Sequence, residues 1–127
     1  MSDLTQVSSK GKMLLDRCVV ANNLLTRMRG LIGHAPLGER EGMWIKPCNS
    51  VHTCFMAFPI DVLFLDEDSV VLHVEHSLRP WRFSKIVFAA RSVLEMGAGA
   101  VAAKSIVCGD KLEFGAKTNG NVSDLSR

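Results

Sequence analysis

Short runs of apolar, β-branched and aromatic residues, separated by turn-forming residues, recur along most of this chain. Runs of this length and composition are typical of strands, and they are expected at residues 13–20, 43–45, 51–55, 60–65, 70–76, 86–96, 105–108 and 111–114. Helix signals are few: Asn22 or Asn23 can cap a short helix with Leu24, Met28 and Leu31 on one face, and residues 100–103 can add one turn. Because strands and helices do not alternate, the pattern predicts a mainly β protein, either a β-sandwich or a partly closed barrel.

The length of the chain sets the number of domains. At 127 residues with 47% hydrophobic content, it is long enough for one core and too short for two ordinary domains. We predict a single β-rich domain over residues 13–114. The polar residues 1–12 and 115–127 are predicted to be a flexible N-terminus and a flexible C-terminal tail.

Net charge and hydropathy limit which partners and which cellular compartment are expected for this protein. A net charge of +2 is far below the basic excess typical of a nucleic-acid binder, so nucleic acid is not expected as a partner. No run approaches the roughly 20 apolar residues that span a bilayer, and residues 1–12 contain no apolar leader, so we expect no membrane partner and a cytoplasmic protein. Four irregularly spaced cysteines predict reduced thiols. The basic stretch with Arg79, Arg82, Lys85 and Arg91 is interpreted as a solvated loop.

The segment 44–66 contains most of the residues that carry chemistry. Cys48, His52 and Cys54 form a C-x3-H-x-C pattern, but zinc normally takes four protein ligands, or three and water, and no second compact cluster completes the set. We therefore expect no metal and no cofactor. A catalytic thiol needs a neighbouring base, and residues two apart on a strand stand roughly 7 Å apart, so no catalytic residue is assigned.

Two carboxylates lie within apolar runs. Asp61 opens the run 60–65, and Glu95 lies within the run 93–96. A buried carboxylate needs hydrogen-bond donors or a cation, and Asp61 is expected to be held by backbone N–H groups or by Arg27 or Arg29. Both carboxylates are interpreted mainly as structural, with a ligand-orienting role as the alternative.

Several short motifs together resemble the family catalogued as domain of unknown function 192. The matching pieces are RMRGL at 27–31, GMWI at 42–45, PCNSVHT at 47–53, FM at 55–56, FPIDV at 58–62, FLD at 64–66, PWR at 80–82, VLE at 93–95, GAG at 97–99, and GD at 109–110 with Leu112. The resemblance implies a compact, jelly-roll-like β-sandwich with one or two short helices. It implies no activity, because none is established for the family.

Three functional hypotheses follow. The leading one is a small binding module with a pocket near His52, Asp61, Trp44 and Trp81, because aromatic walls with a few convergent polar groups are typical of small-ligand sites. The candidate ligand-binding residues are Trp44, Cys48, His52, Thr53, Met56, Asp61, Trp81, Arg82, Arg29 and Glu95. The alternatives are a structural or protein-interaction domain and, less favoured, a thiol- or histidine-dependent enzyme. The partner is expected to be a small molecule or a protein.

Overall fold

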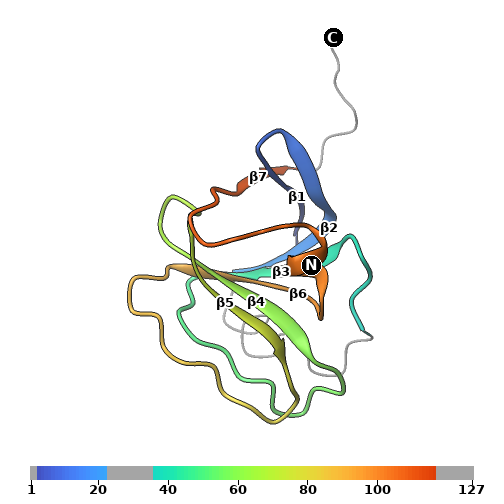
Figure 1. The fold of residues 1–127 in the computed structure, drawn as a ribbon, viewed down its shortest axis with the longest axis vertical. Helices are drawn as coiled ribbons and strands as arrows, with labels where there is room; N and C mark the ends of the chain where they lie inside the picture. The colour runs from blue at the N-terminus through green and yellow to red at the C-terminus, as the bar shows by residue number, and fades with distance from the viewer. Residues whose placement is uncertain (1–2, 23–35, 117–127) are drawn as a thin grey trace.

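The computed structural model describes residues 3–22 and 36–116. Its elements are β1 (Asp3–Ser9), β2 (Lys12–Ala21), β3 (Glu41–Ile45), β4 (Ile60–Leu65), β5 (Val71–Leu78), β6 (Ser92–Gly97), α2 (Ala100–Ala103) and β7 (Glu113–Ala116). The seven strands form one sheet in the order β5-β4-β6-β3-β2-β1-β7 (Figure 1). β2 and β3 pair in parallel, and the other described pairs are antiparallel.

The sheet curls until its two edges approach each other. An isolated bridge joins Val70, just before β5, to Lys111, just before β7. The backbone N–H of Val71 also donates to the Asp110 carbonyl at 2.8 Å. The sheet nevertheless does not close into a barrel, because the two edge strands are not paired along their length.

Hydrophobic side chains pack on both faces of the sheet. β4 lies near its centre and has all six residues buried, because successive side chains of a strand point to opposite faces and here both faces are covered. Leu63 and Leu65 join one core, which Val101 of α2 also enters. Ile60, Val62 and Phe64 join a second core, which Met56 and Phe58 cover from the segment before β4.

The prediction of a mainly β single domain is confirmed, and the jelly-roll-like arrangement stays a prediction. The strand at 60–65 and the helical turn at 100–103 have their predicted bounds, while β2, β3 and β5 differ by one or two residues at their ends. The helix expected after Asn22 lies outside the described residues.

Other expectations about the elements are wrong. Residues 51–55 contain only an isolated bridge, 86–91 and 105–108 are not strand, and residues 3–9 of the N-terminal segment predicted to be flexible form β1. β1 lies between β2 and β7 in the sheet, so its order depends on strands far away in the sequence. In the ranges that the structure describes, no helix has the length and hydropathy to cross a bilayer.

Candidate functional site

Two long loops leave the sheet side by side. Residues 46–59 lead into β4 and residues 79–91 follow β5, and the strand ends that carry them, Ile60 and Leu78, are paired in register. Backbone hydrogen bonds join the loops along their length: the Ser84 N–H donates to the Val51 carbonyl and the Val87 N–H to the Asn49 carbonyl, each at 2.9 Å. The loops therefore form one layer at one end of the molecule (Figure 1).

Thr53 fastens the outer part of this layer. Its backbone N–H donates to the Arg82 carbonyl at 2.8 Å, and its hydroxyl accepts from the Arg82 N–H at 2.9 Å. The same hydroxyl donates to the Arg79 carbonyl. Thr53 is fully buried, so this predicted ligand-binding residue serves to join the two loops.

Three aromatic side chains project from the fastened loops, and we call Phe55, Trp81 and Phe83 the aromatic tip. Their exposed fractions are 67%, 57% and 76%, which is unusual for large apolar side chains gathered in one place. The Phe55 and Trp81 rings meet edge to face with centroids 4.6 Å apart. Both residues also have positive φ angles, 68° and 64°, a backbone conformation that bulky residues rarely adopt.

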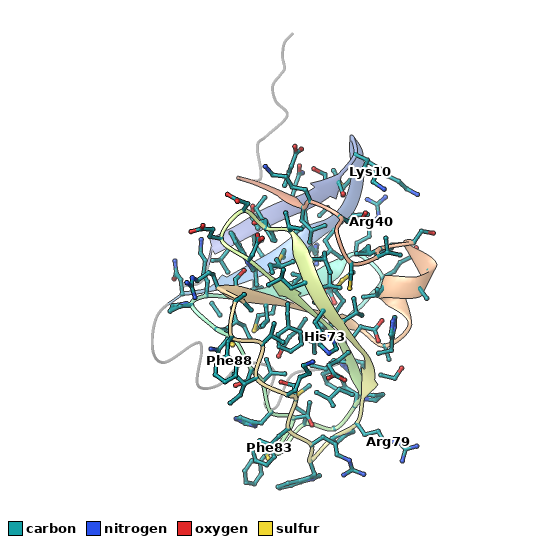
Figure 2. The ribbon with its side chains drawn as sticks, turned by 60° about the vertical axis from the view of Figure 1, so that its left-hand side comes forward. Lys10, Arg40, His73, Arg79, Phe83 and Phe88 are labelled. Atoms are coloured by element: carbon teal, nitrogen blue, oxygen red, sulfur yellow. The ribbon has the colours of Figure 1, made fainter. Side chains whose placement is uncertain are left out.

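The two loops carry only positive formal charges. Lysines and arginines occur at positions 46, 79, 82, 85 and 91, and neither 46–59 nor 79–91 contains an aspartate or glutamate. Phe83 and Arg79 lie at the end of the molecule opposite Lys10 and Arg40 (Figure 2). Arg79, Arg82 and Lys85 are the loop cations nearest to Trp81 and Phe83 in the sequence. Lys46 instead lies over the Trp44 ring, with its Nζ 3.9 Å from the ring centroid.

Asp61 is buried close to this end of the sheet, and both of its carboxylate oxygens are occupied. Oδ1 accepts from the Ser77 N–H at 2.8 Å and Oδ2 accepts from the Val101 N–H at 3.0 Å. The expectation of a buried Asp61 held by backbone donors is confirmed. The carboxylate links β4 to β5 and to α2.

The pocket expected between Trp44, Met56 and Trp81 is not assembled. Trp44 packs against the core that contains Val101, with its ring stacked on Phe114 at a centroid distance of 3.7 Å. Met56 is buried in the other core, and Trp81 is exposed on a loop. The alternation of side chains along β3 places Trp44 on the face of the sheet opposite Met43, which packs with Met56.

The remaining polar candidates do not converge on one point. His52 is exposed and its Nδ1 accepts from the Cys54 N–H at 3.2 Å, while the Cys48 thiol donates to the Ser50 carbonyl at 2.9 Å. The Arg82 side chain is exposed, and Arg29 lies outside the described residues. The described residues contain no group of three or more His, Cys, Asp or Glu side chains placed to hold a metal ion.

Glu95 is the other buried carboxyl, and its surroundings are apolar. It is 3% exposed on β6, opposite Met43 of β3 and Val62 of β4, and its Oε1 has no hydrogen-bond partner. Burial raises the pKa of Glu95 from 4.5 to about 8, because the charged form is deprived of water. Glu95 is thus neutral over much of the range in which an ordinary glutamate is ionised.

One surface hollow lies between the two loops, and another lies beside α2. The first, of about 250 Å³, is lined by Pro47, Cys48, Asn49, Ala90 and Arg91. The other, of about 410 Å³, lies between the segment 37–39 and the start of α2. Neither of these two hollows is lined by Phe55, Trp81 or Phe83, each of which is more than half exposed.

Sequence reasoning missed Phe55 and Phe83 as surface residues and assigned Trp81 to a pocket wall. A signal was present, because residues 79–91 combine Trp81, Phe83, Ile86 and Phe88 with four cations and no acid. That pattern was interpreted as a solvated loop. Ile86 and Phe88 are also more than half exposed, so apolar surface continues along the second loop.

The fold and the tip together define a small, mainly β domain with an exposed loop surface of aromatic and basic residues. The chain belongs to the DUF192 family, described as an uncharacterized ACR, whose model matches residues 5–114. It is similar to a UPF0127 protein from Pyrococcus furiosus, at 32% identity over 111 residues, covering 84% of this chain and 93% of the relative. A UPF0127 protein from Thermococcus sibiricus is 30% identical over 111 residues, covering 84% and 71%.

A solved structure shares the fold. It is a protein of unknown function from Novosphingobium aromaticivorans, with a TM-score of 0.77 and 23% identity, covering 88% of this chain and 84% of that chain. The function of the family is unknown, and these relatives add no activity.

Proposed function

We propose that this protein is a binding module that attaches to its partner through the aromatic tip. The observation that carries the proposal is the exposure of Phe55, Trp81 and Phe83 at one end of two loops that are themselves firmly joined. Contiguous apolar surface rimmed by polar residues is typical of binding surfaces. We thus retain the binding role that the sequence suggested, but we place the binding surface on the exposed aromatic tip and not in a pocket.

The loops are built to hold the tip in place. Thr53 is buried beneath it and binds three backbone groups of the opposite loop. A surface whose side chains are already positioned loses little conformational freedom when it binds, and therefore retains more of its binding free energy. The positive φ angles of Phe55 and Trp81 support the same interpretation, because strained backbone persists where the surroundings enforce it and is concentrated at functional sites.

The apolar area is sufficient for attachment. A buried aromatic side chain removes roughly 150–250 Å² from water, and each Å² of apolar surface contributes about 25 cal/mol. Three such side chains supply on the order of 10 kcal/mol before the costs of association are subtracted. Cations around the tip then favour partners of negative charge.

A photo-crosslinking amino acid with a benzophenone side chain tests the proposal in living cells. It is placed at position 83 in one variant and at position 107 in a matched control, since Val107 is apolar, 58% exposed and outside both loops. Benzophenone inserts into C–H bonds of proteins and lipids alike. We expect a discrete adduct from position 83 that position 107 does not give, and equal labelling from the two positions would refute the proposal.

A further inference from the structure

We propose that the partner surface of the aromatic tip is an anionic lipid bilayer, into whose headgroup region the tip inserts. This inference rests on the proposed function and names the partner of the same site. The absence of a membrane partner was expected from the sequence because no segment is long enough to span a bilayer. Attachment at the surface of a bilayer needs no spanning segment.

The shape of the tip favours a lipid surface over a folded protein partner. Phe55, Trp81 and Phe83 are each more than half exposed, so the tip presents large apolar side chains to solvent. A protein partner must offer a pocket that matches each projecting ring. The interfacial zone of a bilayer accommodates projecting aromatic side chains without such a match, and tryptophan in particular is enriched there.

The charge distribution favours the same partner. Arg79, Arg82 and Lys85 flank Trp81 and Phe83 in sequence, and long basic side chains can lay their apolar stems along a lipid surface while the charge meets the headgroups. Each such cation near an anionic membrane contributes about 1 kcal/mol. An acidic turn, residues 66–68, joins β4 to β5 at the other end of this hairpin, roughly 20 Å away at 3.3 Å per residue. The β4–β5 hairpin therefore has an acidic turn at one end and basic residues beside the aromatic tip at the other.

Vesicle co-sedimentation tests the inference directly. Purified protein is mixed with vesicles of phosphatidylcholine alone or of phosphatidylcholine mixed with phosphatidylglycerol, and bound protein is measured at low and at high salt. Trp81 provides a second readout, because it is more than half exposed and its fluorescence shifts to shorter wavelength when it enters lipid, whereas Trp44 is stacked on Phe114 in both states. We expect binding to the anionic vesicles that weakens with salt, accompanied by the Trp81 shift.

Two pairs of variants separate the contributions. Trp81→Ser combined with Phe83→Ser removes apolar surface from the tip, and Val107→Ser is its matched control. Arg79→Gln combined with Lys85→Gln removes charge, and Lys10→Gln combined with Lys12→Gln removes two cations from the β1–β2 turn. All of these side chains are exposed, so circular dichroism should show unchanged folding. We expect each tip variant to bind anionic vesicles at least about tenfold more weakly, with both controls unchanged.

Two results with vesicles would overturn the inference of a lipid partner. Absence of wild-type binding to anionic vesicles excludes the lipid surface, as does equal binding of the tip variants and their controls. If the in-cell adduct at position 83 is then a protein, the proposed function stands and only its lipid partner is wrong. If position 83 gives no more adduct than position 107, the proposed function itself has failed.

Discussion

Thr53 and Arg82, 29 residues apart in sequence, each donate a backbone N–H to the other across two loops. The Thr53 N–H donates to the Arg82 carbonyl at 2.8 Å, and the Arg82 N–H donates to the Thr53 hydroxyl at 2.9 Å. The Trp81 N–H also donates to the Thr53 carbonyl at 3.0 Å. The position of the aromatic tip thus depends on one buried threonine.

Thr53→Val should lower the free energy of unfolding by roughly 1–3 kcal/mol, because it strands the Arg82 N–H in a buried site while preserving side-chain volume. Denaturant unfolding measures the change. Thr53→Ser keeps the hydroxyl and should retain most of the stability. A loss in Thr53→Ser as large as that in Thr53→Val would show that the methyl group contributes as much to stability as the hydroxyl and its hydrogen bonds.

Asp61→Ala should also lower the free energy of unfolding, by on the order of 2 kcal/mol or more, because the Ser77 and Val101 N–H groups both lose a charged acceptor. Glu67→Ala, in the exposed β4–β5 turn, is the control and should change stability little. Full stability of Asp61→Ala in denaturant would mean that the carboxylate is not a structural fastening, and would return it to the list of candidate functional groups.

Glu95 should make stability depend on pH. Its folded pKa of about 8 lies above its ordinary value of 4.5, so between these values the folded state holds a proton that the unfolded state has released. The contribution of Glu95 to stability is therefore greatest below about pH 4.5 and falls as pH rises toward 8, by at most about 1.4 kcal/mol per pH unit. Glu95→Gln keeps a neutral side chain and should flatten this part of the profile. The free energy of unfolding of the wild type and of Glu95→Gln is measured at pH 5 and pH 8. If both proteins change by the same amount, Glu95 is not a buried neutral carboxyl.

The cysteines should differ sharply in reactivity. No disulfide joins the four, and burial raises the pKa of the Cys18 thiol to about 12, partly offset by a backbone hydrogen bond from Trp44. Cys108 is exposed. Alkylation of the native protein, followed by peptide mass spectrometry, should modify Cys108 early and Cys18 only after unfolding. A thiol count in denaturant without reductant should find four, and a lower count would indicate disulfides.

Local sequence by itself determined the elements whose own composition is typical of their secondary structure. Ile60 to Leu65 is a continuous apolar run, which both faces of a central strand require, and its bounds follow directly from the composition. The burial of Asp61 followed in the same way, because a carboxylate inside such a run must be buried and must find donors. The family could also be identified from short motifs alone.

Tertiary structure decided what depends on distant partners. β1 is polar enough to suggest a flexible end, yet Ser9 donates a side-chain hydrogen bond to the Lys111 carbonyl and the strand is paired on both sides. Residues 51–55 have strand composition, but their backbone hydrogen bonds go to the loop 79–91, because Thr53 turns the chain outward there. The sequence also could not predict that Trp44 and Met56 lie in different cores. It gives the alternation of side chains along a strand, but not which segments cover each face of the sheet. The aromatic tip exists for the same reason: the pairing of Ile60 with Leu78 brings two separate loops together, and no local pattern encodes that pairing.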